Sequence, residues 1–196
     1  MKLQETANHI TNWLKSYAVH AGMKGFVVGI SGGIDSALTS TLCARTGLEV
    51  LTLEMPIHQH PDQASRGKEH QAWLALNFSN SKHHQVDLTP VYDHFVAAMK
   101  LCGAEHELSL ANSRARLRMS TLYYHGQSNG LLVAGTGNKV EDFGVGFYTK
   151  YGDGGVDLSP IADLMKTEVV ALARHLGVVD SILDAKPTDG LWGDDR

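Results

Sequence analysis

Short apolar runs that stop at glycine or proline alternate with segments of helical pattern along most of the chain. The first run, residues 26–30, ends at the serine and two glycines of residues 31–33, and a helical pattern follows. The second run, residues 50–55, stops at Pro56 ahead of another helical pattern. Short strands that alternate with helices build a parallel sheet covered on both faces. The sequence therefore predicts a doubly wound α/β fold with a mostly parallel sheet and helices on both faces.

The rest of the chain continues this alternation, and nothing in it resembles a linker between two cores. We expect a single domain over residues 1–196. An opening helix is predicted from an apolar stripe of Ile10, Trp13, Leu14 and Tyr17. A helix that starts near Pro90 has a predicted apolar face of Val91, Phe95, Ala98 and Met99. The other predictions are strands at 83–88 and 131–134, helices near 71–76, 108–124 and 164–176, and a glycine-rich loop at 143–155.

Composition excludes several classes of function. The 17 Lys and Arg residues are outnumbered by 21 Asp and Glu residues, so we expect no nucleic-acid partner. Neither a signal peptide nor a long apolar run is present, which predicts a cytoplasmic protein with no membrane partner. Cys43 and Cys102 are too far apart in sequence to suggest a disulfide framework or a zinc site, and Cys43 is expected in the core.

The connection after the first predicted strand reads SGGIDS at residues 31–36. Open α/β sheets bind ligands at the carboxyl ends of their strands, where this connection is expected. Paired glycines let backbone N–H groups approach an anion, and the following helix N-terminus adds partial positive charge. The pattern favours a phosphate site. The alternative is a simple turn in which Asp35 or Ser36 caps the helix.

Asp35 has an unfavourable charge for contact with a bare phosphate. A divalent cation that bridges the carboxylate and the phosphate oxygens removes this conflict, so the loop implies a magnesium ion. The chain has no G-x-x-x-x-G-K-[ST] loop, and its glycine-rich stretches near residues 135 and 144 do not spell G-x-G-x-x-G. The loop therefore belongs to neither of those two nucleotide-binding classes.

The SGGIDS segment resembles the SGGxDS pyrophosphate-binding loop of the ATP pyrophosphatases, enzymes that cleave ATP to AMP and pyrophosphate. Residues 135–157, which contain the string TKYGDGG, are similar to NAD synthetases, as is the segment PIADLMKTEV at 160–169. The resemblance implies an adenine nucleotide alpha hydrolase-like fold. It also implies ligase activity in which ATP adenylates the nicotinate carboxylate of deamido-NAD and ammonia then displaces AMP to give NAD.

The same resemblance implies roles for individual residues. The expected ATP contacts are Gly29, Ile30, Ser31, Gly32, Gly33, Ile34, Asp35, Ser36, Thr136, Lys166 and Thr188. The expected magnesium ligands are Asp35 and Glu141, and the expected deamido-NAD contacts are Arg116, Lys150 and Asp157. No catalytic residue is assigned, because the substrate carboxylate and ammonia are the nucleophiles. We accordingly expect no catalytic role for His58, His60, His83 or His84.

Family members imply two further expectations. They are commonly homodimers, and they usually continue past the loop that contains Thr188 into helices that also touch deamido-NAD, which this chain is expected to lack. A chain of 196 residues has no room for a glutamine amidohydrolase domain, so free ammonia is the expected nitrogen donor. Two alternatives stay open: another ATP pyrophosphatase with a different acceptor, such as a GMP synthetase-like enzyme, or a nucleotide-binding module without turnover.

Overall fold

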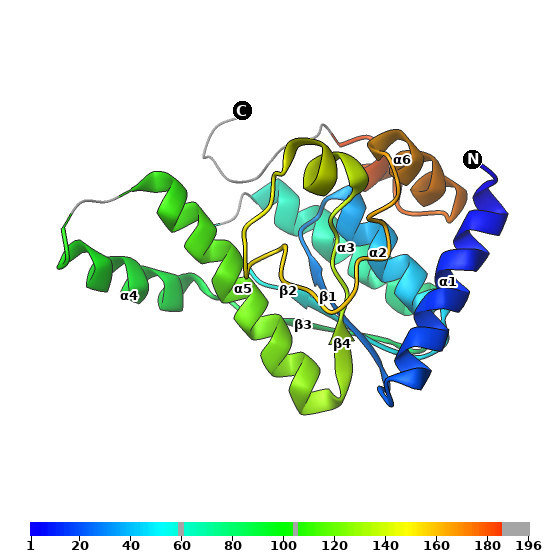
Figure 1. The fold of residues 1–196 in the computed structure, drawn as a ribbon, viewed down its shortest axis with the longest axis horizontal. Helices are drawn as coiled ribbons and strands as arrows, with labels where there is room; N and C mark the ends of the chain where they lie inside the picture. The colour runs from blue at the N-terminus through cyan, green and yellow to red at the C-terminus, as the bar shows by residue number, and fades with distance from the viewer. Residues whose placement is uncertain (59–60, 104–105, 186–196) are drawn as a thin grey trace.

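The computed structural model describes residues 1–58, 61–103 and 106–185. Its helices alternate with short strands for most of the chain (Figure 1). In chain order the elements are α1 (Leu3–His20), β1 (Gly25–Ile30), α2 (Ile34–Arg45), β2 (Glu49–Glu54), α3 (Pro61–Asn77), β3 (Ser81–Gln85), α4 (Thr89–Lys100), α5 (Glu107–Asn129), β4 (Leu131–Val133), the π-helix η1 (Lys139–Val145), α6 (Lys166–His175) and α7 (Asp180–Leu183).

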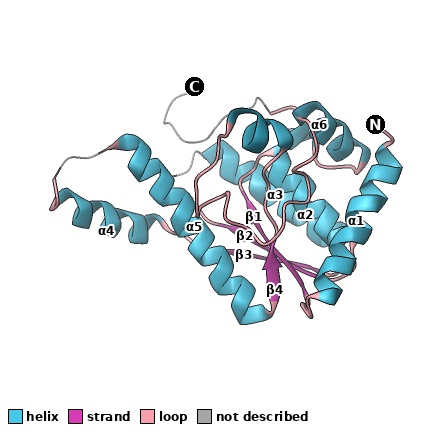
Figure 2. Ribbon diagram, in the orientation of Figure 1, coloured by secondary structure: helices cyan, strands magenta, loops and turns pink. Residues whose placement is uncertain are grey.

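The four strands form one sheet in the order β3-β2-β1-β4, and every neighbouring pair is parallel (Figure 2). In this register Ile30 at the end of β1 is the partner of Glu54 at the end of β2. The carboxyl ends of the strands therefore share one edge of the sheet. The predicted parallel sheet is confirmed, and β1, which precedes the SGGIDS loop, is a central strand.

Two apolar cores cover the two faces of the sheet, as the doubly wound prediction requires. On one face, Phe26 and Val28 of β1 pack in a cluster with side chains of α1, α2, α3 and α6. On the other face, Val27 packs in a second cluster with Met119 and Leu122 of α5. The alternation of side chains along β1 thus sends successive residues into different cores.

Some predicted apolar faces are only partly buried. In α1, Ile10 and Leu14 are buried, whereas Trp13 and Tyr17 are 41% and 42% exposed. In α4 the predicted face is wrong at three positions, since Val91, Ala98 and Met99 are exposed, whereas Tyr92, which lies outside that face, is buried. Helical spacing locates a stripe, but which part of it is covered depends on the neighbouring elements.

Two other predictions need correction. The strand expected at 83–88 is β3, which begins at Ser81 and ends at Gln85 at one edge of the sheet, and its side chains are largely exposed. The loop expected at 143–155 begins inside η1, which extends to Val145 and ends where Gly146 adopts a left-handed φ of 69°. Within the described residues, no helix is long and apolar enough to cross a membrane.

Candidate active site

The SGGIDS loop joins β1 to α2 and is held by its own serines. The Ser36 hydroxyl accepts a hydrogen bond from the Ser31 N–H at 3.2 Å and donates to the Gly33 carbonyl at 2.9 Å. The Ser31 hydroxyl in turn accepts from the Gly33 N–H at 3.2 Å. Gly32 has a φ of 80°, which a residue with a Cβ adopts only with strain. These contacts turn the chain tightly into the first turn of α2.

Positive electrostatic features surround this loop. The N-terminus of α2 begins at Ile34, so the positive end of its dipole faces the loop. Arg66 of α3 donates its Nε–H to the Gly32 carbonyl at 3.3 Å. Helix α3 also approaches closely at Gly67, where an added Cβ would lie 3.5 Å from Ile30. Arg66 has no sequence motif that marks it, because its place beside the loop depends on how α3 packs.

Asp35, Glu141 and Lys166 converge beside the loop from α2, η1 and α6. The Lys166 ammonium donates to Asp35 Oδ2 at 2.5 Å and to Glu141 Oε1 at 2.9 Å. All three side chains are partly buried, with exposed fractions of 34% for Lys166, 17% for Asp35 and 39% for Glu141. The structure thus brings together both expected magnesium ligands and one expected ATP contact that is distant from them in sequence.

The Lys166 ammonium shows that this position suits a cation. Burial lowers the pKa of Lys166, but hydrogen bonds and charge from Asp35, and then from Glu141, outweigh burial and raise the pKa overall. Two carboxylate oxygens are suitable ligands for Mg²⁺. Among the residues placed by the structure, no group of three or more His, Cys, Asp or Glu side chains forms a metal site.

Asn138 is a buried residue of this site that the sequence reasoning missed. Its amide nitrogen donates to Asp35 Oδ1 at 2.9 Å, and its amide oxygen accepts from the N–H groups of Val140 and Glu141 at 3.0 and 3.1 Å. Asparagine is a favoured helix N-cap, and its place three residues before Glu141 is a signal that could have been read. The contact with Asp35 spans 103 residues and has no sequence signal.

Asp142 adds further negative charge near the two carboxylates. Burial raises the pKa of Asp142, and the charges of Asp153, Glu141 and Asp35 raise it further. Its carboxylate lies against Gly137, where an added Cβ would be 1.9 Å from an Asp142 oxygen. This close packing explains why residue 137 is a glycine. The residue before it, Thr136, is half-buried and lies shortly after the end of β4.

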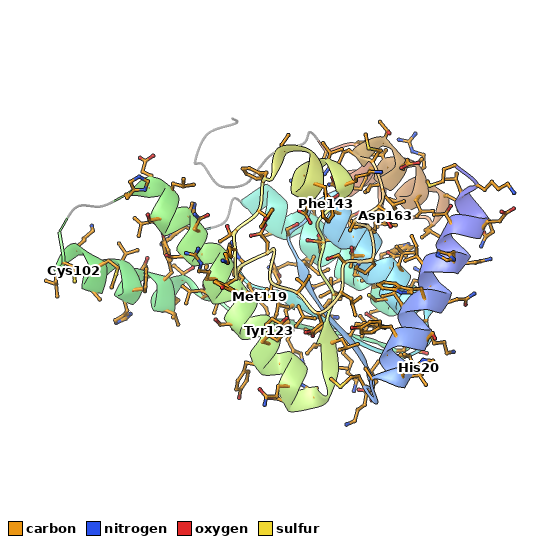
Figure 3. All side chains as sticks on the ribbon, viewed as in Figure 1. His20, Cys102, Met119, Tyr123, Phe143 and Asp163 are labelled. Carbon is orange, nitrogen blue, oxygen red and sulfur yellow. The ribbon has the colours of Figure 1, made fainter. Side chains whose placement is uncertain are left out.

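The expected deamido-NAD contacts form a second group on α5 and the segment after η1. Arg116 donates its Nε–H to the Lys150 carbonyl at 3.1 Å, so these two residues are neighbours. Asp157 lies beside β4, where its carboxylate accepts hydrogen bonds from the Val133 N–H at 2.8 Å and from the Tyr123 hydroxyl at 3.1 Å. Burial raises the pKa of Tyr123, labelled in Figure 3, to about 12, with a further contribution from Asp157.

The remaining expectations concern Thr188, the four histidines and Cys43. Thr188 and His60 lie outside the described residues. His58 bonds to Asp93 at 2.7 Å, while His83 and His84 are exposed on β3. Cys43 is buried, and its burial raises the pKa of the thiol, as expected of a core residue.

Comparisons with known proteins match nearly the whole chain. A family model described as NAD synthase matches residues 6–195. An NH(3)-dependent NAD(+) synthetase of Methanosarcina mazei is 42% identical over 98% of this chain and 74% of its own length. Among solved structures, an NMN synthetase from Francisella tularensis has a TM-score of 0.91 at 33% identity, over 98% of this chain and 78% of that one. An NH3-dependent NAD synthetase from Campylobacter jejuni has a TM-score of 0.84 at 32% identity, over 94% and 77%.

Proposed function

Because the chain belongs to the NAD synthase family, we propose that it is an ammonia-dependent NAD synthetase, a ligase that amidates deamido-NAD at the expense of ATP. In the first step, the nicotinate carboxylate attacks the α-phosphorus of ATP, and the bond to pyrophosphate breaks. In the second, ammonia attacks the acyl carbon of the adenylate, AMP leaves, and the nitrogen loses a proton to give the amide. The relatives named as NH3-dependent support ammonia as the donor.

The convergence of Asp35, Glu141 and Lys166 beside the SGGIDS loop is the observation that carries this proposal. Residues 29–36 would cradle the ATP phosphates, and the N-terminus of α2 would add partial positive charge beside them. Asp35 and Glu141 would hold Mg²⁺, which when bound would offset the charge that develops on departing pyrophosphate. Lys166 and Thr136 would contact the phosphates, and Thr188 is proposed as a further ATP contact from outside the described residues.

The acceptor would bind beside α5. Arg116 and Lys150 are neighbours and supply two positive charges, which suit the diphosphate and carboxylate of deamido-NAD. Asp157 is proposed as a further contact, although both of its oxygens already accept hydrogen bonds from the protein. A homodimer, which rests on the family resemblance, and a cytoplasmic location belong to the same proposal. The description of residues 1–196 as one domain is part of the same proposal; the chain covers about three quarters of its curated relatives' lengths.

The enzyme assay measures NAD and AMP formed from deamido-NAD, ATP, Mg²⁺ and ammonium. We expect equal amounts of both products, and Asp35→Asn should reduce their rate by about 100-fold or more because a metal contributes several kcal/mol of charge stabilisation. Asp163→Asn, which removes an exposed acid, should leave the rate unchanged. Absence of AMP with every acceptor, despite ATP binding, would instead identify a nucleotide-binding module.

A second acceptor is favoured by one observation, the TM-score of 0.91 to a protein named NMN synthetase. Nicotinate mononucleotide carries the same carboxylate as deamido-NAD, so the adenylation chemistry would be unchanged. Parallel assays with the two acceptors distinguish the candidates by their kcat/KM values. A higher value for deamido-NAD supports the main proposal, and a higher value for the mononucleotide replaces it.

A further inference from the structure

We propose that Asn138 is a positioning residue that fixes the two carboxylates of the cation site relative to each other. This inference rests on the proposed magnesium site and goes beyond it. The hydrogen bonds of the Asn138 side chain lead to Asp35 and to the start of η1. Asn138 would therefore act through Asp35 and Glu141.

The first contact sets the orientation of Asp35. The Asn138 amide nitrogen holds Oδ1 at 2.9 Å, while Oδ2 bonds to the Lys166 ammonium. One carboxylate oxygen is thus bound by a neutral donor and the other faces the cation position. A quarter-turn of the carboxylate about its last side-chain bond would break both contacts, so the bond from Asn138 favours the plane in which one oxygen faces the cation position.

The second contact sets the position of Glu141. The Asn138 amide oxygen accepts from the N–H groups of Val140 and Glu141, which are in the first turn of η1. The start of η1 is therefore held by the same side chain that holds Asp35. The bond to the Glu141 N–H holds the backbone of that residue in place. It therefore sets the point from which the Glu141 side chain extends its Oε1 toward Lys166.

Burial makes these contacts costly to lose. Asn138 is fully buried, so the polar atoms that it leaves behind on substitution would have little access to water. Residues that orient metal ligands through hydrogen bonds commonly change metal affinity by about 10- to 100-fold when they are replaced. We expect a change of that size here, with the metal affinity affected more than the fold.

Three substitutions separate the two contacts. Asn138→Ala removes both. Asn138→Ser retains a side chain that can cap η1 but is too short to reach Asp35 in the same way. Asn138→Asp retains the cap acceptor and replaces the donor to Asp35 with a like charge. Asn80→Ala is the matched control, because its amide donates to the Ala44 and Leu48 carbonyls near the amino ends of the strands, away from the site.

The experiment measures binding of Mn²⁺, as a spectroscopic probe for Mg²⁺, to the full chain in the presence of a non-hydrolysable ATP analogue. We expect the Mn²⁺ dissociation constant to rise by about 10-fold or more in all three Asn138 variants and to stay within twofold in Asn80→Ala. In the assay, raised Mg²⁺ should restore much of the rate of Asn138→Ser, since its metal ligands are intact. A role confined to folding would produce neither the affinity change nor this rescue.

Three results would overturn the inference. One is a folded Asn138→Ser or Asn138→Asp protein, with native circular dichroism, that binds Mn²⁺ as tightly as the unmodified chain. Another is an equal loss of affinity in Asn80→Ala. The third is an unmodified chain that binds no Mn²⁺ with the analogue, which would also reject the proposed metal site. If the unmodified chain binds Mn²⁺ and turns over normally, and the Asn138 variants do the same, only the positioning role is rejected and the proposed metal site stands.

Discussion

At the scale of single residues, Lys166 occupies the place between two carboxylates that Mg²⁺ would take. Free metal must therefore compete with an ammonium whose raised pKa keeps it charged. Lys166→Met should bind free Mn²⁺ about tenfold more tightly in the absence of nucleotide. Removal of the competing ammonium should make the binding free energy more favourable by about 1.4 kcal/mol, which corresponds to a factor of ten in affinity.

Equilibrium titration of Mn²⁺ without ATP tests this expectation. Lys139→Met is the matched control, since Lys139 is an exposed cation of η1. The two variants lose the same charge, so a long-range effect would change both affinities equally. Unaltered Mn²⁺ affinity in Lys166→Met would show that the ammonium does not compete with the metal.

His70 gives the protein an acid-sensitive residue outside the active site. It is fully buried, its Nε2 lies 2.9 Å from the Ser40 hydroxyl, and its ring stacks on Trp73 at 5.6 Å. Burial lowers its pKa to about 4, whereas the pKa in the unfolded chain is about 6.5. The unfolded state thus gains a proton first as pH falls. The stability associated with neutral His70 is complete above pH 6.5 and decreases by up to about 3 kcal/mol as the pH falls toward 4.

Urea denaturation at about pH 7.5, 5.5 and 4.5 measures this decrease. His70→Phe removes the titrating group, so its unfolding free energy should fall less steeply over this range. His83→Phe replaces an exposed histidine of β3 and should keep the slope of the unmodified chain. Equal slopes for all three proteins would contradict the assignment to His70.

Individual residues also show how far sequence reasoning reaches. Asp35 and Glu141 lie in segments that resemble those of NAD synthetases, and it is this resemblance that predicted their pairing. Asn138 and Arg66 act through contacts with Asp35 and Gly32 that arise only when distant elements pack. The position of Lys166 between the carboxylates was also unforeseen, since the motif assigned it to ATP alone.

At the scale of elements, α5 packs against β4 through a residue without a side chain. An added Cβ at Gly126 would lie 2.9 Å from the Leu131 carbonyl and 3.4 Å from Val27. Gly126→Ala should therefore lower the unfolding free energy by about 1–3 kcal/mol, despite the better helix propensity of alanine. Urea denaturation measures the change, and Ser128→Ala on the exposed side of α5 is the control. A Gly126→Ala protein as stable as the unmodified chain would show that α5 can move aside without cost.

The elements were predicted best where the local pattern is strong. Apolar runs bounded by glycine or proline located β1, β2 and β4, because such strands are buried on both faces. The exposed side chains of β3 provide little pattern, and its predicted start lies two residues late. The π-helix η1 was missed because its end overlaps the glycine-rich stretch at 143–155, which is typical of a loop, whereas Asn138 caps its first turn.

At the scale of the whole molecule, the increase in stability that a bound ligand produces should show whether the protein is a dimer. Mg²⁺ with a non-hydrolysable ATP analogue at about 100 times its dissociation constant should add about 2.7 kcal/mol. The stabilisation by deamido-NAD should grow with protein concentration if its site lies near a subunit interface, as the proposed homodimer implies. Thermal unfolding over a hundredfold range of protein concentration, with sedimentation as a check, tests this. Concentration-independent shifts for both ligands would favour a monomeric site.

The separation of Asp35 from Lys166 by 131 residues also has a consequence for biosynthesis. At typical elongation rates, a ribosome needs on the order of 10 s to add the residues between them. Until α6 has emerged, the nascent polypeptide carries Asp35 and Glu141 without their lysine counterion, so the charge balance of the site is completed only late in synthesis.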